Sequence, residues 1–250
     1  MLVISFLILC IWGIEFVSIR FLIARSLLAS QLFRLLSGLF ILSFCYFFDL
    51  NQNNFLRIGN LTSTAHPVNW LGITEDESWK KIGAIFLFLV SVVTFFSIYF
   101  PNKKQLRRPA WSYQWLLIIL FLAFNNAAIE EILYRLIPLN IGGLPPSTLA
   151  LFSGLAFGLP HYFGYPSKWV GVFLAGFLGW FLAKSVLETQ GIFLAFLFHW
   201  IQDILIIGIL SLSKTPSMYS CINDNGFFHR IVLPVTAILC IFFVSVFFVI

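Results

Sequence analysis

The stretch Asn125-Asn-Ala-Ala-Ile-Glu-Glu-Ile-Leu-Tyr-Arg135 determines how the whole chain is interpreted. It lies inside an apolar run that extends from Trp115 to Leu139, where a lipid bilayer favours aliphatic side chains. Each charged side chain in such a run costs about 2.5–3.5 kcal/mol on membrane-insertion scales. Two carboxylates and an arginine within six positions therefore call for a functional explanation.

Helical spacing gives the two acids of this stretch different roles. Glu131 and Arg135 are four residues apart, so on an α-helix they lie on one face and can form an ion pair. Glu130 points about 100° away from Glu131 and shares its face with Asn126 and Tyr134. We therefore expect Arg135 to neutralise Glu131, and Glu130 to remain available as a catalytic base.

The composition is that of a polytopic membrane protein. Of the 250 residues, 60% are hydrophobic and only 10% are charged, whereas soluble domains contain about 25% charged residues. The net charge of +5 is explained by Lys and Arg beside helix ends, so we expect a lipid bilayer and no nucleic acid as partner. The four cysteines are scattered without a CxxC pair, which gives no indication of a redox role.

Apolar runs of about 17–25 residues predict an all-α transmembrane helical bundle of about eight spans, with a catalytic cavity within the membrane. We expect an integral, multi-pass protein with one membrane domain over residues 1–250, whose motif-bearing core covers about 113–212. The N-terminus has neither a basic region nor an obvious cleavage site, so its first run is expected to be a retained span. The expected spans are 1–23, 32–50, 82–101, 113–139, 147–166, 169–186, 190–212 and 229–250.

Two later spans contain further polar positions. Phe157-Gly-Leu-Pro-His161 places an imidazole beside a proline that should bend its helix, with Phe157 one turn earlier on the same face. His199-Trp-Ile-Gln-Asp203 places a second imidazole four residues before a carboxylate, so the two side chains can touch. A lone membrane histidine is more often a helix-packing residue than a catalyst. Two histidines and several carboxylates on three helices, however, are expensive to bury and have a clear chemical use.

Two mechanisms fit these residues. In the first, Glu130 and His161 hold and deprotonate a water molecule, which attacks a peptide carbonyl. His199, with help from Asp203, then stabilises the oxyanion. In the second, Glu130, His161 and His199 bind Zn²⁺ and leave one position open for water. The sequence contains no HExxH, so the usual helical signature of zinc proteases is missing.

Three motifs, in order on separate expected spans, resemble those of the CAAX prenyl protease type II and bacteriocin-processing (CPBP, or Abi) family. They are Glu130-Glu131-x-x-x-Arg135, Phe157-x-x-x-His161 and His199-x-x-x-Asp203. The family consists of multi-pass intramembrane endopeptidases, commonly labelled metalloproteases, for which a metal-free glutamate mechanism is also argued. The resemblance implies a peptide or protein substrate at the membrane, cut in CAAX-type C-terminal processing or in bacteriocin-related processing, and prenylated in one branch.

Carried over to this chain, the resemblance implies that Glu130 and His161 activate water and that His199 and the residue four later form the oxyanion site. In the prenyl-protease branch that last residue is typically Asn, whereas this chain has Asp203. A carboxylate donates a hydrogen bond only when it is protonated. We therefore expect Asp203 to orient His199 or to bind a metal, and we prefer the metal-free version.

Two other classes of membrane protein also bury polar residues. A proton-coupled transporter relays protons through Glu and His side chains, but the inverted repeats and matched broken helices typical of transporters are not visible in the sequence. A non-catalytic immunity or scaffolding protein would use the same residues as a structural network. Uptake of a substrate by reconstituted vesicles would favour the transporter. An unchanged biological role after Glu130→Gln or His161→Gln would favour the scaffold.

Overall fold

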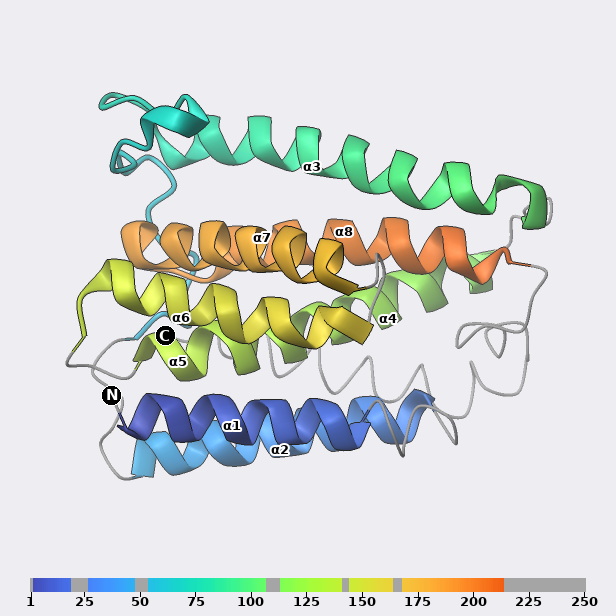
Figure 1. The fold of residues 1–250 in the computed structure, drawn as a ribbon, viewed down its shortest axis with the longest axis horizontal. Helices are drawn as coiled ribbons and strands as arrows, with labels where there is room; N and C mark the ends of the chain where they lie inside the picture. The colour runs from blue at the N-terminus through green and yellow to red at the C-terminus, as the bar shows by residue number, and fades with distance from the viewer. Residues whose placement is uncertain are drawn as a thin grey trace. The chain divides into compact units, whose positions relative to one another are not determined.

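The computed structural model describes residues 2–18, 27–47, 54–106, 113–140, 144–163 and 168–213. These residues form helices and loops, with β-structure limited to isolated bridges, so the predicted all-α class is confirmed (Figure 1). The helices are α1 (Leu2–Val17), α2 (Leu27–Phe47), α3 (Trp79–Asn102), α4 (Tyr113–Glu131), α5 (Ile137–Asn140), α6 (Pro146–Gly158), α7 (Lys168–Thr189) and α8 (Phe193–Ser211). A π-helical turn (Ile132–Leu136) joins α4 to α5, so the described part of the chain contains seven separate helices.

The predicted number of eight spans is wrong. Among the described residues, four helical segments are long and apolar enough to cross a membrane. They are Trp79–Gln105, Tyr113–Asn140, Lys168–Thr189 and Phe193–Ser211. They correspond to the runs expected at 82–101, 113–139, 169–186 and 190–212.

The other predicted spans do not appear as helices long and apolar enough to cross a membrane among the described residues. The run expected at 147–166 is interrupted because α6 ends at Gly158 and continues as a 3₁₀ turn (Leu159–Phe163) that contains Pro160. At 13 residues, α6 is about 20 Å long, whereas a bilayer core is about 30 Å thick. In the N-terminal runs, α1 is described over 16 residues and α2 offers a shorter apolar stretch. The run at 229–250 lies outside the described residues.

The chain divides into two compact units. The first consists of residues 1–82 and 129–196, and the second of residues 83–128 and 197–250. Helices α1, α2, α5, α6 and α7 belong to the first unit, whereas most of α3, most of α4 and most of α8 belong to the second. The single domain expected over residues 1–250 stays a prediction.

Glycines bring α6 and α7 into close contact in the first unit, where the two helices lie side by side (Figure 1). A Cβ atom at Gly158 would lie only 2.7 Å from the carbonyl oxygen of Val172 and 2.8 Å from Cα of Gly176. Gly154, one turn earlier, meets the Gly176 carbonyl oxygen in the same way. Small residues allow such close backbone approach between membrane helices.

The π-helical turn has a local cause in Pro138. Proline has no N–H to donate to the carbonyl four residues earlier, and its ring clashes with that carbonyl. The carbonyl in question belongs to Tyr134, and it accepts a hydrogen bond from the hydroxyl of Ser153 on α6 instead. All five residues of the turn are buried. The turn therefore presents Tyr134 and Arg135 to the interior of the first unit.

Helices α1 and α2 pack against the same region of the first unit. Trp12 on α1 donates a hydrogen bond from Nε1 to the Ala156 carbonyl of α6, at 3.0 Å. On α2, a Cβ atom at Gly38 would lie 3.2 Å from Cδ2 of Leu133 in the π-helical turn. The N-terminal helices are thereby fixed against α6 and the turn.

In the second unit, α8 contacts both α3 and α4. Trp200 on α8 donates a hydrogen bond to the Leu120 carbonyl of α4, at 3.2 Å, and its ring meets Phe124 edge-on. Gln202 Nε2 donates to the hydroxyl of Ser91 on α3, at 2.9 Å. These contacts fix the face of α8 that carries His199 and Asp203.

Candidate active site

Glu130 lies at the end of α4 in a cluster of buried charges. Its Oε1 atom is 2.7 Å from Nη2 of Arg34, which comes from α2. Arg34 also contacts Oε1 of Glu15 on α1, with both Nε and Nη2 at 2.8 Å. The fully buried side chain of Tyr134 lies near these residues. The side chain of Glu130 is only 12% exposed, so this cluster is almost entirely shielded from solvent.

This cluster corrects one expectation from the sequence. Glu130 was expected to have no basic partner, but Arg34 forms an ion pair with it. The pairing depends on the packing of α2 against the π-helical turn rather than on spacing within one helix. Glu15 and Arg34 are functional candidates that sequence reasoning missed. Their signal in the sequence is a charged side chain inside each of the two N-terminal apolar runs.

The second acid of the motif follows the expected local geometry. Glu131 and Arg135 are four residues apart, and Oε1 of Glu131 lies 3.3 Å from Nη1 of Arg135. Arg135 is fully buried, and its guanidinium carbon lies 4.4 Å from the centre of the Phe157 ring. A guanidinium over an aromatic face gains a cation–π attraction, which is stronger when the pair is desolvated. Phe157 thus contacts Arg135 from α6.

His161 is positioned by the same phenylalanine. It lies in the 3₁₀ turn after α6 and is half-buried, rather than in the middle of a span as expected. Its Nδ1 atom is 2.8 Å from the Phe157 carbonyl oxygen, and the two rings are 4.6 Å apart. Phe157 also meets the Tyr134 ring edge-on at 5.2 Å. Tyr134, Phe157 and His161 therefore form one continuous row of rings in the first unit.

The third motif forms a separate polar group in the second unit. Nε2 of His199 lies 3.8 Å from Oδ2 of Asp203, as their four-residue spacing indicated. The same carboxylate oxygen accepts a hydrogen bond from Nδ2 of Asn126, at 3.1 Å. His199 and Asp203 are both buried. Asn126, expected to support Glu130, is thus placed beside Asp203 as well as one turn before Glu130.

The residues expected to bind zinc do not form a metal site within either unit. Among the described residues, no group of three His, Cys, Asp or Glu side chains is placed to hold a metal ion. Arg34 also places a positive charge 2.7 Å from the carboxylate of Glu130, which disfavours a cation there. The donor set formed by Glu130, His161 and His199 therefore gives no specific support for a metalloprotease.

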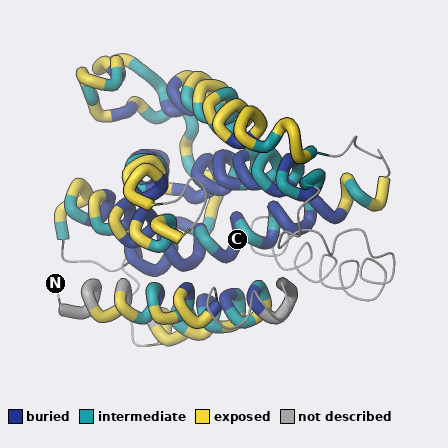
Figure 2. Tube along the Cα trace, turned by 45° about the vertical axis from the view of Figure 1, so that its right-hand side comes forward, coloured by how far each residue is buried: buried dark blue, intermediate teal, exposed yellow. Residues whose placement is uncertain are grey.

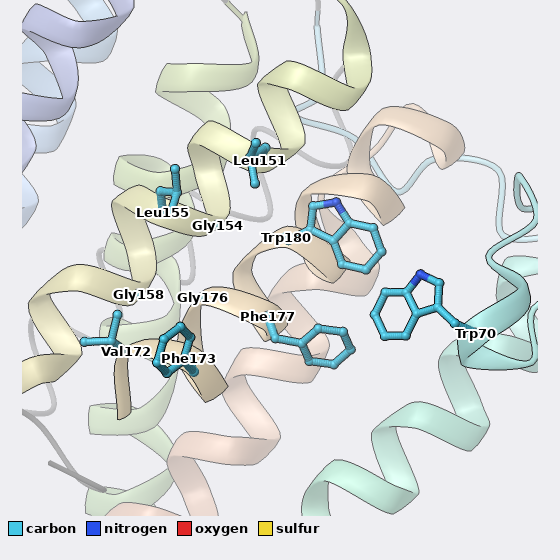
Figure 3. A pocket seen from close by; sticks show the side chains of 10 residues that line it. All are labelled: Trp70, Leu151, Gly154, Leu155, Gly158, Val172, Phe173, Gly176, Phe177 and Trp180. Atoms are coloured by element: carbon cyan, nitrogen blue, oxygen red, sulfur yellow. The ribbon is translucent and has the colours of Figure 1, made fainter. Parts of the chain in front are cut away.

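An apolar cavity of about 360 Å³ lies between α6 and α7 (Figure 3). Its lining residues are Trp70, Leu151, Gly154, Leu155, Gly158, Val172, Phe173, Gly176, Phe177 and Trp180. None of the predicted catalytic residues lines it, although Gly158 directly follows Phe157. The cavity carries no chemistry of its own, because no titratable side chain contributes to its wall.

Comparison with known proteins finds a similarity to a family over part of the chain. Residues 109–205 match the family described as type II CAAX prenyl endopeptidase Rce1-like. The matched segment contains all three motifs, from Glu130 to Asp203. No curated protein and no solved structure matches the chain. With four described helices able to cross a membrane, the chain is a multi-pass membrane protein, and its residues 109–205 are similar to the Rce1-like type II CAAX prenyl endopeptidase family.

Proposed function

We propose that this protein is an intramembrane endopeptidase that hydrolyses peptide bonds of membrane-associated substrates. The observation that carries the proposal is Glu130, the first acid of a motif set inside a type II CAAX prenyl endopeptidase match, held in a buried charge cluster. A carboxylate shielded from bulk water and fixed by a charged hydrogen bond can hold and deprotonate a water molecule. His161, on the row of rings that starts one turn after Glu130, is its partner in this step.

The net charge of the cluster allows Glu130 to act as a base. Glu15, Arg34 and Glu130 together carry two negative charges and one positive charge, so Arg34 neutralises only part of the two carboxylates. One net negative charge remains near the water to be activated. In the proposed reaction, Glu130 takes a proton from water, the hydroxide attacks the peptide carbonyl, and the proton passes to the leaving amine.

His199 and Asp203 have the supporting role in this proposal. An imidazole that donates a hydrogen bond stabilises the negative charge that develops on the carbonyl oxygen. Asp203 accepts from Asn126 and lies beside His199, so it is suited to orient the imidazole and not to donate to the oxyanion itself. Replacement of the Asn found in the prenyl-protease branch by Asp203 thus shifts the donor role to His199 alone.

The proposed substrate is a peptide segment at the membrane, cut in CAAX-type C-terminal processing and prenylated. The family description supports this choice, because it names a prenyl endopeptidase.

The test is hydrolysis by purified protein in detergent or liposomes. A prenylated peptide ending in a CAAX sequence, incubated in H₂¹⁸O, should yield a shortened peptide with ¹⁸O in its new carboxylate. Glu130→Gln and His161→Gln should each reduce turnover by about 10²–10⁴-fold, the usual contribution of general acid–base catalysis. Glu77→Gln, the same change in a loop acid paired with Lys81, serves as the matched control. Full activity of Glu130→Gln would contradict the proposal.

A further inference from the structure

A single arginine joins three helices in the first unit. Arg34 on α2 contacts Glu15 on α1 at 2.8 Å and Glu130 at the end of α4 at 2.7 Å. The three side chains are only 7–12% exposed. A planar guanidinium can bind two carboxylates at once through a rigid fork of donors, whereas a lysine ammonium is a point charge on a flexible stem and fixes their directions less well. The geometry therefore fixes the direction in which the Glu130 carboxylate points.

Glu15 and Glu130, the two acids that contact Arg34, differ in whether they belong to the motif set. Glu130 belongs to the motif set, whereas Glu15 and Arg34 lie more than 70 residues before the matched segment 109–205. Removing one partner from a buried ion pair leaves an uncompensated charge. With Glu15 present, Arg34 is already paired, and its positive charge does not fall wholly on Glu130. Glu15 thus limits how far Arg34 neutralises the motif acid.

We propose that Arg34 is the positioning residue for Glu130, and that Glu15 is the counter-charge that keeps Glu130 basic. The α1–α2 pair is then part of the active site although it lies outside the matched segment. Its attachment supports this role, because Trp12 binds the Ala156 carbonyl and Gly38 packs against Leu133 beside the motif. The catalytic half of this inference rests on the proposed function, whereas the charge coupling does not.

The coupling between Arg34 and Glu130 is tested by chemical labelling that needs no activity. Dicyclohexylcarbodiimide is apolar and reacts with protonated carboxyl groups, and mass spectrometry locates the adduct. Because a nearby positive charge favours the ionised form of a carboxylate, Glu130 should be labelled slowly in the unaltered protein. In Arg34→Gln it should be labelled about tenfold faster. Equal labelling of Glu130 in the two proteins would overturn the positioning role.

Peptide hydrolysis tests the catalytic half. Arg34→Gln should lower kcat about tenfold to hundredfold with KM within about twofold, and Arg34→Lys should restore part of kcat because it keeps the charge but not the fork. Glu15→Gln should lower kcat about tenfold while Glu130 stays slowly labelled, because Arg34 then pairs with Glu130 more fully. An unchanged kcat in Glu15→Gln would overturn the counter-charge role.

The matched control is a second buried cation in the same unit. Lys184 on α7 forms an ion pair with Glu188 and is about as buried as Arg34. Lys184→Gln should change neither the labelling of Glu130 nor kcat. Elution as a single peak on size exclusion checks that each variant is folded, and Arg34→Lys and Glu15→Gln decide the outcome if Arg34→Gln does not fold. If the unaltered protein hydrolyses no peptide, the proposed function fails, whereas the labelling result still judges Arg34.

Discussion

Glu130 and Glu131 are adjacent in the chain but contact different arginines. Glu131 lies 3.3 Å from Arg135, which is one turn later in the π-helical turn that continues α4. Glu130 lies 2.7 Å from Arg34, which also has Glu15 as a partner. Loss of the Glu131 carboxylate therefore leaves the fully buried Arg135 without its contacting carboxylate. Loss of the Glu130 carboxylate leaves Arg34 still paired with Glu15.

This difference predicts opposite phenotypes for two isosteric substitutions. Glu131→Gln removes the carboxylate beside Arg135, and breaking a buried ion pair in this way costs about 3–5 kcal/mol. We expect lower abundance in the membrane and a lower melting temperature in detergent. Glu130→Gln should keep abundance and a melting temperature close to that of the unaltered protein, because Glu15 still pairs with Arg34. Equal melting temperatures and equal turnover of the two variants would contradict this division of roles.

Helix α6 is short, and the position where it ends determines where the imidazole of His161 lies. Gly154 and Gly158 allow it to approach the α7 backbone closely, and Pro160 ends its regular hydrogen bonding. Phe157 and His161 are consequently held at the boundary between an α-helix and a 3₁₀ turn. A change in the spacing of α6 and α7 should therefore shift both rings.

Gly158→Ala tests this packing. The new methyl group would lie 2.7 Å from a backbone oxygen of Val172, and such overpacking costs about 1–3 kcal/mol. We expect a lower melting temperature and reduced peptide turnover. Gly208→Ala on α8 is the matched control, since nothing outside the backbone of its own helix lies within 4 Å of the added Cβ. Alanine also favours a helix over glycine by about 0.5–1 kcal/mol. A melting temperature in Gly158→Ala at or above that of Gly208→Ala would contradict the close contact.

At the scale of the whole molecule, the four candidate spans differ in how much of their surface is buried within the protein. Only 17% of the apolar window of Trp79–Gln105 is buried, compared with 67% in Tyr113–Asn140. Large apolar side chains such as Phe88 and Val93 are exposed on α3. Much of this helix is coloured as exposed in Figure 2. In a membrane protein such side chains face lipid. We therefore expect α3 to have more contact with lipid acyl chains than the segment Tyr113–Asn140, which carries the first motif.

A photoactivated carbene reagent dissolved in the bilayer checks this difference. After illumination of reconstituted protein, mass spectrometry should find several-fold more label on peptides from 83–101 than on peptides from 118–140. Addition of a water-soluble radical scavenger should not change the ratio, because both segments lie inside the membrane. Equal labelling of the two segments would contradict the burial difference.

Local features of the fold and site could be predicted from the sequence. Residues four apart on a helix meet regardless of the rest of the fold, which is why the Glu131–Arg135 and His199–Asp203 contacts follow from spacing alone. The composition likewise indicated a helical membrane protein, and the family resemblance agrees with the match over residues 109–205.

Features that depend on packing between distant segments could not be predicted. The Arg34–Glu130 contact joins residues 96 positions apart, and no periodicity connects them. The number of spans was overestimated because hydropathy does not register where Gly158 and Pro160 end a helix within an apolar run. The π-helical turn before Pro138 also rotates Arg135 relative to an ideal α-helix, a change that a fixed 100° per residue omits.

Sharing of Arg34 between two acids also constrains how this chain can vary among relatives. A neutral residue at position 34 would leave two carboxylates of like charge in a space almost closed to water. Such a sequence could persist only if position 15 changed to a neutral residue in the same lineage, or if a new cation appeared nearby. Positions 15 and 34 should therefore be exchanged together during divergence, while position 130 stays acidic through each exchange.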